Sequence, residues 1–245
     1  MIRVAGLQKR FGAVTAVDDV SFEARDGAIT GLLGPNGAGK TTTLRMLYAV
    51  MKPDAGTIAV DDVDAVRAPQ EAQARLGVLP DGFGLYPRLT AREHIHYFGE
   101  LQGIGGRALQ RRTGELLKLL DMASIADRRT GGFSHGERTK VALARALVHD
   151  PRNVLLDEPT NGPDVMSTRA VRMIVRRLRD AGHCVLFSSH VMQEVSALCD
   201  SIVVIAAGRV VARGTPDELR SDTGHQSLED AFVALTGLER AADEP

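Results

Sequence analysis

One segment of the chain fits a complete phosphate-loop pattern, G-x-x-x-x-G-K-[ST]: Gly34-Pro35-Asn36-Gly37-Ala38-Gly39-Lys40-Thr41. An apolar run (residues 30–33) precedes it and a helical pattern (residues 41–50) follows it, which is the strand–loop–helix context that the pattern requires. Glycines let backbone N–H groups turn inward around a β-phosphate, and the helix N-terminus adds a favourable dipole. Lys40 then neutralises charge on the β- and γ-phosphates, and the Thr41 hydroxyl ligates Mg²⁺. The sequence therefore predicts a nucleotide-binding loop that ends at Thr42.

A second candidate feature is the acidic pair Asp157 and Glu158, which follows the apolar run at residues 154–156. In a phosphate-loop fold, a carboxylate at the end of a nearby strand holds the Mg²⁺ shell, and an adjacent one orients or deprotonates water. On its own, an acidic pair that ends a strand is more often a solvated turn. Combined with the glycine loop, the pair predicts metal binding by Asp157 and water activation by Glu158.

The pattern of apolar residues predicts one α/β domain with a helical insertion. Apolar runs at residues 30–33, 154–156 and 184–187 are each followed by polar or glycine-rich residues and a helical pattern, which is typical of βα units with a parallel sheet. Other segments predict strands at 2–7, 16–24, 56–60, 202–206 and 209–212, a mainly helical block at 90–148, and a last helix at 227–235.

Length and composition narrow the class of protein. The 245 residues are 44% apolar and can bury a full core, while 30 basic against 31 acidic residues give a net charge of −1, which argues against a general nucleic-acid binder. The longest uncharged stretches have 13 residues, whereas a membrane span needs about 20 apolar residues. The N-terminus lacks a signal-peptide pattern, and Cys184 and Cys199 have no paired spacing. We expect a soluble globular protein of a reducing compartment.

Further segments, in family order, make the chain similar to the ATP-binding cassette (ABC) family of transport ATPases over nearly its whole length. Phe133-Ser134-His135-Gly136-Glu137 stands where the family has its signature, usually Leu-Ser-Gly-Gly-Gln, and residues 138–147 resemble the signature helix. Asn161-Gly162-Pro163-Asp164 stands in the place of the D-loop, and His190 in that of the switch histidine. Phe11 lies where the family stacks an aromatic ring on adenine.

The resemblance implies a P-loop NTPase (RecA-like) fold: a parallel sheet core, an N-terminal antiparallel β subdomain and a helical insertion subdomain. It implies an ABC ATPase domain at residues 1–220, with the helical subdomain at about 85–150, and a C-terminal helix and tail at 221–245.

The resemblance also implies a mechanism. Two cassettes pair head to tail, most simply as an ATP-dependent homodimer, and each ATP lies between one subunit's phosphate loop and the other's signature. Glu158 and His190 are then catalytic, and Mg²⁺ is held by Thr41, Asp81 and Asp157. Residues expected to bind ATP are Phe11, Gly34, Pro35, Asn36, Gly37, Ala38, Gly39, Lys40, Thr41, Thr42, Ser134, His135, Gly136, Glu137 and Asp164. The partners are integral membrane subunits encoded separately, which puts the chain on the cytoplasmic face of the cell membrane.

Three residues depart from the family pattern. Asp81 replaces a Gln that senses Mg²⁺, water and the membrane partner, His135 replaces the first signature glycine, and Pro163 replaces a D-loop Leu. Because Lys40 and Glu158 are present, activity is still expected. Asp81 together with residues 84–90 and 227–232 resembles ATPase subunits of prokaryotic export systems, sodium-extruding exporters first and drug exporters next.

Two other functions stay open on the sequence. One is a soluble cassette that uses ATP-driven dimer closure on ribosomes or DNA, although such proteins usually carry two cassettes or a long coiled coil. The other is a regulatory subunit that binds ATP with little turnover, for which Asp81 and His135 are the argument. A GTPase is disfavoured, because the chain has no Asn-Lys-x-Asp guanine motif.

Overall fold

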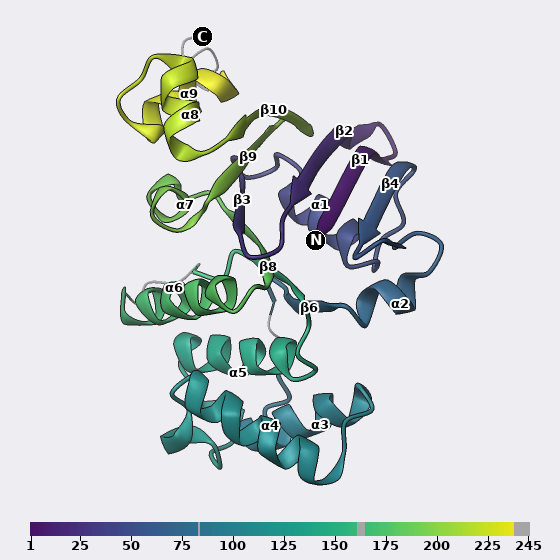
Figure 1. Ribbon diagram of the computed structural model, residues 1–245, viewed down its shortest axis with the longest axis vertical. Helices are drawn as coiled ribbons and strands as arrows, with labels where there is room; N and C mark the ends of the chain where they lie inside the picture. The colour runs from purple at the N-terminus through teal and green to yellow at the C-terminus, as the bar shows by residue number, and fades with distance from the viewer. Residues whose placement is uncertain (83, 161–164, 238–245) are drawn as a thin grey trace.

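A largely parallel sheet forms the centre of the molecule (Figure 1). The computed structural model describes residues 1–82, 84–160 and 165–237. The strands of this sheet, in spatial order, are β10 (Arg209–Gly214), β9 (Ser201–Ala206), β3 (Ile29–Leu33), β8 (Cys184–Ser189), β7 (Asn153–Asp157) and β6 (Leu76–Leu79). All neighbours are parallel except β10 and β9, which are antiparallel. Every residue of β3, β7 and β8 is buried, which explains why each of these strands contains an apolar run in the sequence.

A four-stranded antiparallel sheet lies beside the parallel one. Its order is β2 (Val14–Ala24), β1 (Ile2–Phe11), β4 (Ala55–Val60) and β5 (Val63–Asp64). Ile2 lies opposite Ala24 on one side and Val60 on the other, and all three side chains are fully buried. The two sheets are joined by a hydrogen bond from Asp18 N to Gly208 O, 2.7 Å long. This contact holds the antiparallel sheet against the end of the parallel sheet at which the strands finish.

Helices pack against the parallel sheet and also form a separate group at one end of the molecule. The α-helices are α1 (Lys40–Leu47), α2 (Pro69–Gln73), α3 (Ala91–Leu101), α4 (Gly106–Leu119), α5 (His135–Leu147), α6 (Val165–Asp180), α7 (Met192–Leu198), α8 (Pro216–Thr223) and α9 (Leu228–Thr236). Figure 1 shows α3, α4 and α5 grouped at one end and α8 and α9 at the other. Over the residues that the structure describes, no helix has both the length and the apolar character needed to cross a bilayer.

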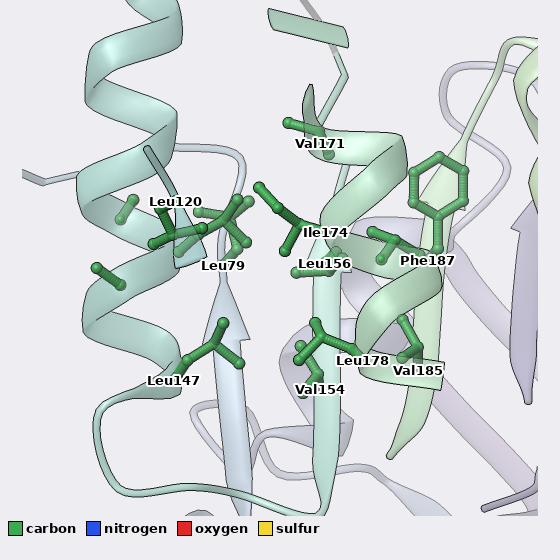
Figure 2. Packing of buried hydrophobic residues seen from close by; sticks show 14 of the residues in the cluster. Leu79, Leu120, Leu147, Val154, Leu156, Val171, Ile174, Leu178, Val185 and Phe187 are labelled. Atoms are coloured by element: carbon green, nitrogen blue, oxygen red, sulfur yellow. The ribbon is translucent and has the colours of Figure 1, made fainter. Parts of the chain in front are cut away.

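The apolar core is divided between the two faces of the parallel sheet. On one face, Ile174 and Leu178 of α6 pack against Val154 and Leu156 of β7 and against Phe187 of β8 (Figure 2). On the other face, α1 and the antiparallel sheet bury a second cluster. Removing one such side chain from water contributes roughly 1.5–3 kcal/mol, so the strands that carry the site residues are held on both sides.

The structure confirms the predicted α/β fold class and corrects several boundaries. The helix expected at residues 41–50 ends at Leu47, because Ala49 has a positive φ of 55° that no α-helix accommodates. The block at 90–148 divides into α3, α4 and α5, with Thr90 as the N-cap of α3. Strand β6 was not predicted, since its four residues include a glycine and give little β signal.

Candidate functional site

The predicted phosphate loop connects the end of β3 to the start of α1. Gly37 and Gly39 have positive φ angles of 80° and 102°, which residues with a side chain rarely adopt. A Cβ on Gly39 would lie 2.4 Å from the carbonyl oxygen of Ala16, whereas a Cβ on Gly37 would meet nothing within 4 Å. As the N-cap of α1, Gly39 supplies no side-chain acceptor. The first N–H groups of the helix are therefore available to an anion.

A pocket of about 290 Å³ opens in front of this loop. Its lining residues are Ala16, residues 36–42, Asp81, Glu158 and His190. Most of them follow the carboxyl ends of parallel strands: the loop follows β3, Asp81 follows β6, Glu158 follows β7 and His190 follows β8. Open α/β sheets bind ligands outside these strand ends. The fold thus brings together residues that are far apart in the sequence and that were predicted to act on one nucleotide.

The side chain of Lys40 folds back onto the first residues of the phosphate loop. Its side chain is only 6% exposed, and its ammonium group donates hydrogen bonds to the carbonyl oxygens of Gly34, at 2.7 Å, and Pro35, at 3.1 Å. The Glu158 carboxylate lies 3.6 Å from the Lys40 Nζ. A buried ammonium group at the wall of a pocket attracts an anion strongly, because the protein interior screens charge less than water does. This position suits contact with a phosphate.

Asp157 ends β7 and is 3% exposed. Its Oδ1 accepts hydrogen bonds from Ser188 Oγ, at 2.7 Å, and Thr41 Oγ1, at 3.4 Å. Burial is the main influence on this carboxyl and raises its pKa above the usual value; the negative charges of Asp81 and Glu158 act in the same direction, and the two hydrogen bonds oppose it. A cation placed here would relieve this unfavourable charge.

The donor set around Thr41 fits Mg²⁺ that binds together with a nucleotide. Within the described residues, no group of three or more His, Cys, Asp and Glu side chains could hold a metal ion. Mg²⁺ usually takes one or two carboxylates and completes its shell with phosphate oxygens and water. The Thr41 hydroxyl and the Asp157 carboxylate offer two oxygens next to the phosphate loop, so the remaining ligands would come from phosphate and water.

Glu158 and His190 face each other at the mouth of the pocket. His190 Nδ1 lies 2.9 Å from Glu158 Oε2, and the Glu158 N–H donates to Ser188 Oγ at 2.9 Å. Glu158 has a positive φ of 48°, a conformation that costs about 1–3 kcal/mol for such a residue and persists only where its surroundings enforce it. With a side chain 12% exposed, its carboxylate is in a position to accept a proton from water in the pocket.

The signature segment does not line this pocket. Ser134 is the N-cap of α5 and accepts a hydrogen bond from Glu137 N, while the Glu137 carboxylate accepts one from Ser134 N at 2.8 Å. Arg128 lies 2.9 Å from the same carboxylate. The Ser134 N–H and Arg128 hold the pKa of Glu137 below its usual value. Ser134, as the N-cap, and His135 and Gly136, which open the helix, thus form a second helix N-terminus that lies apart from the pocket.

Two further predicted residues lie apart from the pocket lining or outside the described residues. Phe11 is 47% exposed at the end of β1 and does not line the pocket. The predicted nucleotide contact of Asp164, with Pro163 beside it, lies outside the described residues. Sequence reasoning missed Ser188, whose hydroxyl bonds to both Asp157 and the Glu158 N–H. In the sequence, Ser188 is marked only by its position two residues before His190, and that position does not predict its contacts with Asp157 and Glu158.

Comparison with known proteins places this pocket in context. The sequence pattern of the family described as "ABC transporter" matches residues 17–161. The chain is 43% identical over 239 residues to the "ABC transporter ATP-binding protein NatA" of Bacillus subtilis (strain 168), which covers 96% of this chain and 97% of that protein. It is 38% identical over 228 residues to the "Daunorubicin resistance ATP-binding protein DrrA3" of Streptomyces coeruleorubidus, which covers 93% and 72%.

Similarity in three dimensions is as extensive. A solved structure described as the "ATP binding subunit of ABC transporter" superimposes with a TM-score of 0.88 at 28% identity, over 96% of this chain and 99% of that chain. The similarity in sequence and in fold therefore extends over the pocket and over nearly all of the chain.

Proposed function

Because this chain belongs to the ABC transporter family, as one of its ATP-binding subunits, we propose that it hydrolyses ATP to power export through separately encoded membrane subunits. Members of this family are ATPases. One observation carries the proposal: Lys40, Glu158 and His190 converge on a pocket built on the phosphate loop. Proteins named for resistance to a drug and for Nod factor export are among the relatives, which supports an exporter.

Each side chain at the pocket has a distinct role in the proposed reaction. The loop at residues 34–42 binds the phosphates through its backbone N–H groups, which every residue except Pro35 carries, and Lys40 neutralises their charge. Thr41, Asp157 and Asp81 would hold Mg²⁺, which would neutralise phosphate charge there. Glu158 accepts a proton from the attacking water.

His190 keeps the Glu158 carboxylate in place through the 2.9 Å contact and, as a residue that lines the pocket, is proposed to contact the γ-phosphate. The Glu158 N–H bond to Ser188 Oγ fixes the backbone of the same residue. Water activation thus depends on groups that end two neighbouring strands, β7 and β8.

A second copy of the chain completes the site. Ser134, His135, Gly136 and Glu137 lie at the N-terminus of α5 and do not line the pocket of their own chain. A nucleotide bound at one phosphate loop is therefore proposed to meet the signature segment of a partner, with Phe11 stacking on adenine and Asp164 contributing at the interface. ATP then holds the homodimer together, and hydrolysis releases it.

The membrane subunits are proposed to contact the helical part of the chain at residues 85–90. Tyr86 is 49% exposed there, and its ring meets Tyr97 edge to face at a centroid distance of 5.9 Å. Thr130 Oγ1 donates to Tyr86 O at 2.8 Å, which anchors the segment to the helical subdomain. Docking at this face would put the chain on the cytoplasmic side of the membrane. This proposal includes a division of the chain into an ATPase domain at 1–220 and a C-terminal helix and tail at 221–245. The helical subdomain, at about 85–150, is part of the ATPase domain.

Reconstitution tests the proposed function. The chain is co-expressed with the membrane subunits, and the complex is placed in liposomes to measure ATP-driven flux of sodium ions and of a fluorescent drug. ATP-dependent export of either substrate supports the proposal, and sodium is the substrate that the sequence resemblance favours. Binding to ribosomes or DNA without any membrane partner would support the soluble alternative, and ATP-induced dimerisation without phosphate release would support the regulatory one.

A further inference from the structure

Glu194 is a buried carboxylate that the proposed mechanism does not use. It lies in the first turn of α7, four residues after His190, and is 7% exposed. An acidic residue in the first turn of a helix is commonly a solvent-exposed group that interacts with the helix dipole. Burial at this position calls for specific partners instead, because an ionised carboxylate in the protein interior is costly unless it is paired.

Both oxygens of the Glu194 carboxylate have partners on other segments. Glu194 Oε2 accepts a hydrogen bond from Thr160 Oγ1, and Glu194 Oε1 lies 3.6 Å from Arg172 Nη2 on α6. Thr160 comes two residues after Glu158 in the segment that leaves β7. Glu194 therefore ties α7 to α6 and to the segment that carries the proposed general base.

Two contacts between side chains consequently join the segment after β7 to the segment after β8. The first is the 2.9 Å contact between Glu158 and His190, and the second is the bond between Thr160 and Glu194. Because Glu158 has a positive φ of 48°, its backbone relies on neighbouring contacts to stay in that conformation. Its N–H is bonded to Ser188, and Thr160 is the next described anchor on its C-terminal side.

We infer that Glu194, acting through Thr160, is a positioning residue for ATP hydrolysis that keeps Glu158 and His190 aligned. The inference rests on the proposed function. It assigns Glu194 no contact with the nucleotide, since neither Glu194 nor Thr160 lines the pocket. Loss of the Thr160 bond lets the Glu158 backbone relax towards an ordinary conformation, which moves the carboxylate away from the attacking water while the phosphate loop stays intact.

The test uses Thr160→Val, which removes the hydroxyl at nearly constant volume and keeps the ion pair between Glu194 and Arg172 that Glu194→Ala would break. Phosphate release and the affinity for a fluorescent ATP analogue are measured on the full chain together with its membrane subunits. We expect kcat to fall by about tenfold or more, while the dissociation constant of the analogue changes by less than about twofold. Thr160→Ser keeps the hydroxyl and is expected to restore kcat to within about threefold of the wild type.

A double-mutant cycle and a matched control strengthen the assignment. If the two residues act through one bond, Glu194→Ala combined with Thr160→Val lowers kcat no further than the more damaging single change does. Gln193→Ala alters the neighbouring, exposed position of α7 and is expected to leave kcat unchanged.

Wild-type kcat in a folded Thr160→Val protein would overturn the inference, as would equal losses of kcat and nucleotide affinity. Multiplicative effects in the double mutant would also contradict action through a shared bond. These results leave the proposed function standing as long as the wild type hydrolyses ATP and Glu158→Gln does not. A wild-type complex that releases no phosphate would refute the proposed function itself.

Discussion

Replacing Gly39 by Ala should damage the phosphate loop far more than the same change at Gly37. Both residues have positive φ, so each alanine costs about 1–2 kcal/mol in backbone strain. At Gly39 the new Cβ would also lie 2.4 Å from the Ala16 carbonyl oxygen, about 1 Å inside ordinary contact, and a strand backbone cannot easily move aside. The clash adds about 1–3 kcal/mol, as overpacking of a tight site does. The sum is about 2–5 kcal/mol for Gly39→Ala, against about 1–2 kcal/mol for Gly37→Ala.

Urea denaturation of both variants measures these losses, and titration with a fluorescent ATP analogue measures the loop itself. Because relief of the clash would shift the N–H groups at the start of α1, Gly39→Ala should lose at least one charge-assisted hydrogen bond to phosphate, worth about 1.5–3 kcal/mol, and so about 10- to 100-fold in nucleotide affinity. The strain in Gly37→Ala alone predicts a smaller loss. Equal destabilisation by the two changes, or wild-type affinity in Gly39→Ala, would refute the idea that contact with Ala16 fixes the loop.

Three further predictions concern charge, pH and packing. Lys40→Ala removes a charge-assisted contact to phosphate of about 1.5–3 kcal/mol, so calorimetric titration should show nucleotide affinity lowered by about 10- to 100-fold with the fold retained. Burial lowers the pKa of His94 below its usual value of 6.5. The unfolded chain therefore binds the proton more readily than the folded chain, and the free energy of unfolding should fall as the pH drops below 6.5. The difference between the urea midpoints at pH 7.5 and at pH 5.5 should be smaller in His94→Gln than in the wild type. Phe187 is fully buried, so Phe187→Ala should cost about 3–5 kcal/mol of unfolding free energy, whereas Val211→Ala, at a position 41% exposed, should cost about 0.5 kcal/mol.

Much of the fold follows from the sequence because its central strands are buried on both faces. Strands β3, β7 and β8 each contain an apolar run for this reason, and the residues of the candidate site lie at or just after the ends of these strands. The short strand β6 shows the limit of this approach. Its pairing with β7 from Leu76 to Leu79 is set by tertiary contact rather than by local pattern.

The candidate site was predictable to the extent that its residues lie within motifs. Lys40 was predicted from the phosphate-loop motif, Asp157 and Glu158 from their place after an apolar strand, and His190 from the family resemblance. The structure brings all four together. The contacts that support Asp157 and Glu158 from β8 and from His190 were not predictable, because they join residues 30 or more positions apart through side chains of common types. The bond between Ser188 and Asp157 is one example of such a contact.

The positive φ of Glu158 shows the same limit at the level of the backbone. Nothing in an Asp-Glu-Pro sequence predicts a left-handed glutamate, since this conformation is enforced by neighbours that only the folded chain supplies. The bond from the Glu158 N–H to Ser188 Oγ is one of these neighbouring contacts.

The central claim, that this pocket hydrolyses ATP with Glu158 as the base and closes as a dimer, is tested most directly by one paired measurement. Phosphate release and ATP-dependent dimerisation are followed on the wild type and on Glu158→Gln, with light scattering during size-exclusion chromatography to report the dimer. We predict that the wild type releases phosphate and returns to its resting state, while Glu158→Gln releases none and accumulates as an ATP-bound dimer. Hydrolysis by Glu158→Gln at the wild-type rate would contradict the assignment of the base, and the absence of a dimer in both proteins would contradict the shared site.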